Sequence, residues 1–226
     1  MRSRRIPYAR LWALPLIFGL HLGIYLVVTR VIDRYPASVI STIYGPLDAW
    51  IPHLPATWPL YWAAYPYVIL CGSAAMLRLS RPAYVRGVAA FALMIALGAI
   101  GHLAFPAPAP WPIDPHPLQR ATHESFLTRP WATLPSMHVA FCTLTSVLLA
   151  RAFSGWRVPA AGWLITFLVA LSTLTLKEHV VLDAVAGMSL GLIIGTWWSR
   201  GLHPSPATQP TPAPAAVAPS HKGARA

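Results

Sequence analysis

Residues 11–31 read "LWALPLIFGLHLGIYLVVTRV", and this stretch decides the class of fold. It is almost wholly apolar, and about 20 apolar residues in a helix are needed to cross the hydrocarbon core of a bilayer. The run lacks a clear small-residue cleavage site, so we expect it to be retained as a helix and not removed as a signal peptide. The fold is therefore expected to begin inside a membrane.

Five further apolar runs follow the first, at residues 59–77, 87–105, 135–151, 158–176 and 180–198. The chain of 226 residues is 56% hydrophobic and 10% charged, and its mean hydropathy of +0.53 is higher than soluble domains usually reach. We expect an all-α, polytopic membrane protein with six transmembrane helices within residues 11–201. A basic segment, 1–10, precedes this domain. A Pro/Ala-rich tail, 202–226, follows it and is expected to be disordered.

Basic residues outside the apolar runs predict the orientation of the chain. They gather at the start of the chain, at 78–86, at 151–157 and after the last run. By the positive-inside rule all four segments face the cytoplasm, so both termini are predicted to be cytoplasmic. The acidic residues fall on or near the opposite side: Asp33, Asp48, Asp114, Glu124, Glu178 and Asp183. The net charge of +11 then reflects the basic residues that orient the chain in the membrane. These residues form no stripe with interleaved aromatic residues, so the sequence gives no indication of nucleic-acid binding.

Two connections on the predicted outer side are rich in proline and tryptophan. Residues 44–55 read "YGPLDAWIPHLP" and residues 105–117 read "FPAPAPWPIDPHP". Proline interrupts helices, and tryptophan prefers the headgroup zone of a bilayer. We therefore expect a lid or interfacial segment that lies on the membrane surface, where short helices can form; the alternative for each is an ordinary loop.

The stretch "TLPSMHVAFC" at 133–142 predicts the start of a helix on the outer side. Pro135 suits the first helical position, where its missing N–H costs nothing. The amides of Ser136, Met137 and His138 are then expected to be free donors at the positive end of the helix, which favours an anion. The Ser136 hydroxyl adds a further donor. A histidine near a membrane interface is more often structural, so His138 alone does not establish a site.

A second stretch, "STLTLKEHVVLDAVAG" at 172–187, makes a catalytic site the better interpretation. His179 and Asp183 are four residues apart and would share a helix face. A carboxylate inside the bilayer is costly and usually marks function, although a helix-stabilising His–Asp pair would also explain the spacing. If Asp183 accepts a hydrogen bond from one imidazole nitrogen, the other is left as a base or nucleophile. The pair is expected at the membrane level of His138, with Lys177 beside it.

Two histidines, a carboxylate and nearby cationic or amide donors suit phosphoryl transfer, because the charge on the phosphate must be neutralised while the leaving oxygen is protonated. Outer-side cations available for the phosphate are Lys177, Arg129 and Arg120, and an arginine can grip two phosphate oxygens at once. No acidic cluster suits Mg²⁺, so we expect no metal and no cofactor. The alternative is a proton-coupled transporter or channel, in which the two histidines and Asp183 would form a relay. Against it, the ionisable residues gather at one surface.

The motifs "PSMH" and "STLTLKEHVVLD" together resemble the second and third signature motifs of the type 2 phosphatidic acid phosphatase superfamily. They look closest to its inositol phosphorylceramide synthase-like branch. The superfamily patterns are P-S-G-H and S-R-x5-H-x3-D, and here Met137 replaces the glycine and Thr173 the arginine. The segments "PLDAWIPHLP" and "FPAPAP" are similar to the D-x-x-I-P-x-x-P and F-P-x-x-x-P segments of that branch. The first motif, K-x6-R-P, is incomplete, because Arg129-Pro130 is preceded by Thr122 where the lysine would stand.

The resemblance implies that His179 is a nucleophile forming a phosphohistidine, that Asp183 orients it, and that His138 protonates the leaving group. It implies a lipid phosphatase or phosphotransferase acting on phosphatidic acid, a polyprenyl (di)phosphate or a phospholipid headgroup donor. The expected partners are the membrane and a lipid phosphate. We expect a bacterial plasma-membrane protein with its site on the periplasmic or extracellular side. The replaced motif residues leave a catalytically inactive homologue as another alternative.

Overall fold

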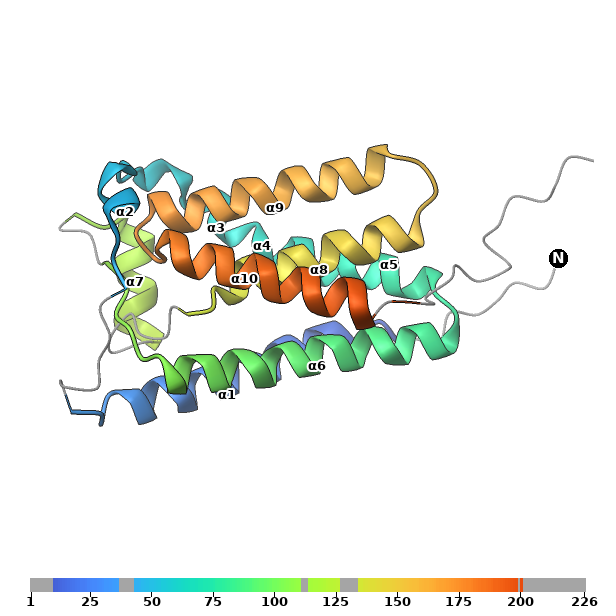
Figure 1. Cartoon of the computed structure of the whole chain (residues 1–226), viewed down its shortest axis with the longest axis horizontal. Coiled ribbons are helices and arrows are strands. Elements are labelled where there is room, and N and C mark those ends of the chain that lie inside the picture. The colour runs from blue at the N-terminus through green and yellow to red at the C-terminus, as the bar shows by residue number, and fades with distance from the viewer. Residues whose placement is uncertain (1–9, 37–42, 111–113, 127–133, 199, 201–226) are drawn as a thin grey trace, which may run out of the picture.

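The computed structural model describes residues 10–36, 43–110, 114–126, 134–198 and 200 (Figure 1). Within these residues every regular element is a helix. In chain order the elements are α1 (Ala13–Ile32), α2 (Pro46–Trp50), η3 (Pro55–Thr57), α3 (Trp58–Trp62), α4 (Ala64–Pro66), η4 (Tyr67–Cys71), α5 (Gly72–Arg78), α6 (Arg81–Ala104), α7 (Pro117–Phe126), α8 (Met137–Ala152), α9 (Arg157–Thr175), α10 (Val181–Ile193) and η5 (Ile194–Trp198).

The predicted apolar runs are all helical, which confirms an all-α integral membrane protein. Four helical stretches are long and apolar enough to cross a bilayer: Ala13–Ile32, Pro55–Arg78, Arg81–Ala104 and Arg157–Thr175. Two shorter apolar helices, Met137–Ala152 and Val181–Trp197, correspond to the other two runs. Figure 1 shows these helices running along the long axis of the molecule. Six membrane crossings therefore remain a prediction, since two of the helices are short.

Helix α8 forms the centre of the bundle. Every residue from Val139 to Leu149 is buried, and α8 contacts α5, α6, α9 and α10. A helix that is apolar all round is expected to be enclosed in this way. Small residues allow neighbouring helices to approach closely in a membrane. On α10, a Cβ added to Gly191 would lie only 2.6 Å from the Cβ of Thr143.

The second span, Pro55–Arg78, is a broken helix made of α3, α4, the π-helical η4 and α5. Pro59 and Pro66 lie within it, and proline cannot donate to the helical ladder. A buried hydroxyl pair ties this span to α8, because Tyr67 Oη lies 2.7 Å from Ser146 Oγ. Ser146 Oγ in turn lies 2.8 Å from Thr166 Oγ1 on α9. The irregular span is thereby fixed against the centre of the bundle.

At one end of the bundle, arginine side chains bond to backbone carbonyls from distant parts of the chain. The Arg78 Nε donates to the carbonyl of Ala152 at 3.2 Å, and the Arg86 guanidinium to the carbonyl of Arg200 at 3.3 Å. The start of α10 and the surface helices α2 and α7 lie at the other end (Figure 1). This arrangement agrees with the predicted segregation of charge. The side of the membrane on which each end lies stays a prediction, and segments 1–9 and 201–226 lie outside the described residues.

The two Pro- and Trp-rich connections each contain a short helix, and their position at the membrane surface stays a prediction. Helix α2 follows Gly45, whose amide donates to the Asp48 carboxylate at 2.8 Å. Helix α7 is held by Gln119, which is fully buried and whose side-chain amide donates to Glu178 Oε1 at 2.6 Å and to the Leu176 carbonyl at 3.1 Å. Gln119 attaches α7 to the loop that joins α9 to α10, and Lys177 of that loop attaches α2 by donating to the Asp48 carbonyl at 2.9 Å.

Candidate active site

The start of α8 differs by two residues from the prediction. Ser136 is the N-cap, with φ −64° and ψ 109°, and Met137 is the first helical residue. The expectation that Pro135 would be the first helical residue is wrong. The Ser136 amide is also not free, because it donates to the backbone carbonyl of Asp183 at 3.0 Å. This bond holds Ser136 outside the helix and joins the start of α8 to α10.

The positive end of α8 nevertheless remains a potential anion site. The Ala140 amide donates to the Ser136 carbonyl at 3.0 Å, which is the first bond of the helical ladder. The amides of Met137, His138 and Val139 precede that bond, as the first amides of any helix do. The Ser136 hydroxyl is fully buried and has no hydrogen-bond partner within the described part of the chain. It is therefore available to donate to a bound oxygen.

Glycines on α6 and α10 make room for the start of α8. A Cβ at Gly187 of α10 would lie 2.3 Å from the Ser136 carbonyl oxygen, and one at Gly101 of α6 would lie 2.7 Å from Pro135 Cδ. A Cβ at Gly98 would lie 2.3 Å from the Met137 sulfur. The Met137 side chain thus occupies the space over Gly98. Where the P-S-G-H pattern has a glycine, this chain has a methionine, and a glycine on the facing helix α6 makes room for it.

His179 and Asp183 are in contact, but not through the helix face that the spacing suggested. His179 precedes α10, which begins at Val181. The Asp183 Oδ2 accepts hydrogen bonds from the Val180 amide at 3.1 Å and from His179 Nδ1 at 3.3 Å. Asp183 is thus both the capping carboxylate of α10 and the partner of the imidazole. Because Nδ1 is engaged, Nε2 is the nitrogen left for chemistry.

The two histidines of the two motifs lie close together. Their ring centroids are 6.1 Å apart and their planes are inclined by 63°. The second span contributes aromatic contacts to His138: the Tyr65 hydroxyl lies 3.0 Å from its Nε2, and the Tyr61 ring lies 4.3 Å from its ring. His102 of α6 supports the same segment by donating to the Pro135 carbonyl at 3.0 Å. The structure therefore brings His138 close to the His179–Asp183 pair, and the catalytic roles of the three residues stay a prediction.

Lys177 anchors the surface segment to the site loop. Its ammonium donates to the carbonyls of Asp48 and Ile51, at 2.9 and 2.6 Å. Its backbone is left-handed, with φ +60°, which is uncommon for a residue other than glycine. The Asp48 carboxylate accepts from the amide of Val181 at 2.7 Å and so lies at the start of α10. A lysine has three donors, so one remains for a phosphate, and the binding role of Lys177 stays a prediction.

Thr173 occupies the position of the superfamily arginine. It is fully buried, and its hydroxyl donates to the Ala170 carbonyl at 2.8 Å. Its own carbonyl accepts the amides of Glu178 and His179, both at 3.1 Å. Thr173 therefore holds the loop that carries His179 against the end of α9.

The two predicted arginines are placed differently. Arg120 is exposed on α7, next to the buried Gln119 that binds the site loop. Arg129 lies outside the described residues. Whether either contacts a phosphate stays a prediction.

Sequence reasoning did not assign Asp48, Tyr61, Tyr65 or Gln119 to the site. Asp48 is only 5% exposed. It is the aspartate of the D-x-x-I-P-x-x-P-like segment, and that position was the sequence feature that could have pointed to it. Tyr61 and Tyr65 are four residues apart and share a helix face, but aromatic residues at a membrane interface usually anchor a helix. Gln119 carried no signal, because a lone glutamine in a Pro-rich connection fits no motif. Tyr61, Tyr65 and Gln119 were recognisable only from their contacts.

The family comparison agrees with this geometry. The family model described as the PAP2 superfamily matches residues 46–197. No curated protein and no solved structure matches the chain. The matched range covers most of the chain and runs from the surface helix α2 to the end of the last apolar helix, so it includes both histidine motifs. The chain therefore belongs to the PAP2 superfamily, as its two histidine motifs predicted.

Proposed function

We propose that this protein is an integral membrane lipid phosphatase or phosphotransferase that works through a phosphohistidine at His179. The observation that carries the proposal is the approach of His138 to a His179 whose Nδ1 is bonded to Asp183, with 6.1 Å between the two ring centroids. Displacement at phosphorus requires two groups: a nucleophile, here oriented by a carboxylate, and a general acid close enough to reach the leaving oxygen of the same substrate. Superfamily membership supports the same class of reaction.

The reaction proceeds in two displacements. The Nε2 of His179 attacks phosphorus, so that a P–N bond forms while the P–O bond to the leaving group breaks. His138 gives its proton to the leaving oxygen, and Asp183 stabilises the positive charge that forms on His179. Water, or the hydroxyl of an acceptor alcohol, then attacks phosphorus and cleaves the P–N bond. His138 takes up the acceptor's proton in this second displacement.

Donors around the site would neutralise the phosphate oxygens. The first amides of α8 and the unpartnered Ser136 hydroxyl form one group of donors. The third donor of Lys177 forms a second contact, and Arg120 and Arg129 are proposed as further phosphate ligands. Thr173 stands where the superfamily pattern has an arginine, and no single donor in this proposal takes over the phosphate contacts of that arginine. The phosphate charge is shared among several weaker contacts instead.

A lipid substrate is supported by the surroundings of the site. Leu47 and Trp50 of α2 are 64% and 85% exposed, although α2 is anchored beside the site loop by Lys177. Exposed apolar side chains next to a buried polar site suit a ligand with a charged head and an apolar tail. Phosphatidic acid, a polyprenyl (di)phosphate and the headgroup donor of an inositol phosphorylceramide synthase-like transferase all have this form.

We place the site on the outer face of the membrane. It lies at the end of the bundle opposite Arg78 and Arg86, which donate to the carbonyls of Ala152 and Arg200. By the positive-inside rule those residues face the cytoplasm. In a bacterial plasma membrane the site would then open to the periplasm or the cell exterior.

The test is phosphate release by the purified full chain in detergent, with phosphatidic acid and a polyprenyl diphosphate as substrates and no added metal. His179→Ala is expected to lower the rate at least about a thousand-fold, since removal of a nucleophile abolishes the whole pathway. His116→Asn serves as the control, because His116 precedes α7, its Nδ1 accepts the Leu118 amide, and it has no role in the proposed steps.

A transferase without its acceptor would release no phosphate but would retain label from a phosphorylated lipid. Adding candidate alcohols should then produce turnover. A chain that neither turns over nor becomes labelled refutes the proposal, and a transporter or an inactive homologue would behave in that way.

A further inference from the structure

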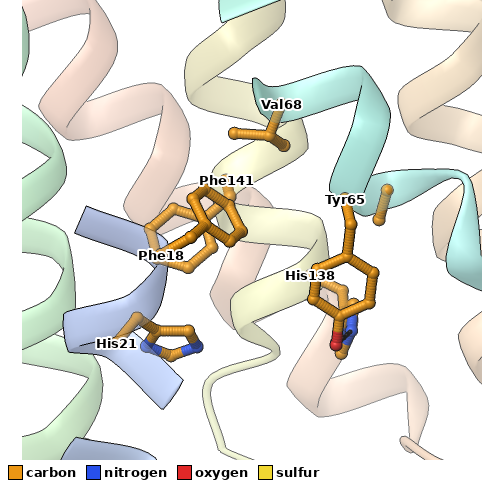
Figure 2. Close-up of a pocket in the computed structure, with 7 residues that line it drawn as sticks. Phe18, His21, Tyr65, Val68, His138 and Phe141 are labelled. Atoms are coloured by element: carbon orange, nitrogen blue, oxygen red, sulfur yellow. Dashed lines mark hydrogen bonds between the residues drawn. The ribbon is translucent and has the colours of Figure 1, made fainter. Parts of the chain in front are cut away.

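Tyr65 makes the side-chain hydrogen bond that holds His138. Its hydroxyl lies 3.0 Å from His138 Nε2, and its ring stands edge-on to the imidazole, with 5.4 Å between centroids and 88° between planes. Figure 2 shows the hydroxyl against the imidazole. A phenol both donates and accepts, so it can pair with Nε2 in either protonation state of the histidine. The contact therefore persists whether or not His138 carries its extra proton.

Tyr65 is itself held in place by its neighbours. It lies in α4, within the broken second span, and its ring centroid is 5.0 Å from that of Trp62 and 6.3 Å from that of Phe18. Aromatic contacts at these distances favour one arrangement of the rings. The hydroxyl is thus presented to His138 by a rigid surface, which is what precise orientation of an acid requires.

A small cavity is lined by both Tyr65 and His138. It has a volume of about 30 Å³ and is lined mainly by apolar side chains, with His21, Tyr65 and His138 as its polar members (Figure 2). Such a volume has room for about one water molecule and none for a phosphate headgroup. His179, which must meet the phosphate, does not line it. The phosphate is therefore not received in this cavity, and because the Tyr65 hydroxyl already pairs with Nε2, Nδ1 is the nitrogen of His138 left for the leaving group.

We propose that Tyr65 is the positioning residue for the general acid, and that His138 exchanges its catalytic proton through Nδ1. This inference rests on the function proposed above. In the protonated imidazole, Nε2–H donates to the Tyr65 oxygen while Nδ1–H faces the leaving group. As the bond from His179 to phosphorus forms and the P–O bond breaks, the Nδ1 proton moves to the leaving oxygen. Nε2 keeps its proton, and Nδ1 accepts one from water or alcohol in the second displacement.

The test separates orientation of the acid from general damage to the protein. An alkoxide leaves a lipid phosphate only if it is protonated, whereas 4-nitrophenolate leaves without a proton. Tyr65→Phe keeps the ring and removes the hydroxyl, so the rate on phosphatidic acid should fall about 10- to 100-fold. Both esters are compared as kcat/KM, which reports the first displacement alone, and the value for 4-nitrophenyl phosphate should change less than about threefold. The ratio of the two rates does not depend on the folded fraction, so it remains informative in a destabilised variant.

Tyr67→Phe is the matched control, since it removes the same atom two residues away. The Tyr67 hydroxyl bonds to Ser146 inside the bundle, so this variant should lose stability and keep the ratio of rates. His179→Ala, assayed in parallel, tests the underlying function, which fails if that variant keeps both activities. If His179→Ala is inactive on both esters while Tyr65→Phe keeps the wild-type ratio, Tyr65 does not position the acid and this inference is overturned.

Discussion

Gly187 allows α10 to pack against the start of α8, and the effect of adding one methyl group there follows from the structure. A Cβ on residue 187 would lie 2.3 Å from the Ser136 carbonyl oxygen and 3.1 Å from its carbonyl carbon. Both are backbone atoms, so no side chain can rotate away. Because ordinary contact begins at 3.4 Å, the two helices would have to separate by about 1 Å at this point.

That displacement should affect stability and activity together. Overpacking of this kind costs about 1–3 kcal/mol, which lowers the unfolding temperature by several degrees in a chain of this size. It should also weaken the bond between the Ser136 amide and the Asp183 carbonyl, now 3.0 Å long. His138 moves with α8, and His179 with the start of α10. A misplacement of about 1 Å between reacting groups can lower kcat about 100-fold.

Thermal unfolding in detergent and phosphate release from phosphatidic acid would measure both effects for Gly187→Ala. Gly23→Ala on α1 is the matched control, since a Cβ there would meet nothing within 4 Å. Alanine is also the better helix former, so this variant should be as stable as wild type or slightly more so. If Gly187→Ala keeps the wild-type unfolding temperature and rate, the close approach of α10 to Ser136 does not hold the site together.

Three further substitutions test other contacts. Asp183→Asn should lower kcat about 10²- to 10⁴-fold, because the amide cannot hold His179 in one tautomer; an unchanged rate of phosphate release would remove Asp183 from the mechanism. Lys177→Met loses two charge-assisted bonds to backbone carbonyls and should destabilise the fold by about 2–4 kcal/mol. An unaltered unfolding temperature would show that the surface segment is held by other contacts. Met137→Gly restores the superfamily pattern but empties a buried space, at a cost of about 2–5 kcal/mol. The double variant with Gly98→Met should regain part of that stability, and a single variant as stable as wild type would contradict the packing described here.

The membrane helices were predictable from the sequence because hydropathy is a property of each segment alone. The first predicted run, 11–31, agrees with Ala13–Ile32 to within two residues. The third, 87–105, began too late, since Arg81–Ala104 includes a basic first turn that extends beyond the apolar run. Hydropathy also did not reveal the breaks in the second span. Backbone irregularity depends on how a helix packs as well as on its prolines.

Within the site, His179 and Asp183 could be paired from sequence because four residues separate them and a capping carboxylate acts locally. Contacts between distant segments, such as His138 with Tyr65, were not predictable in this way. The bundle helices here are apolar on nearly all sides, so no amphipathic pattern indicates which face meets which neighbour.

The sequence by itself determined that the chain lies in a membrane, which superfamily it belongs to and which side chains are candidates for the chemistry. Tertiary structure decided how those side chains meet, because that depends on where glycines such as Gly98 and Gly187 let one backbone approach another.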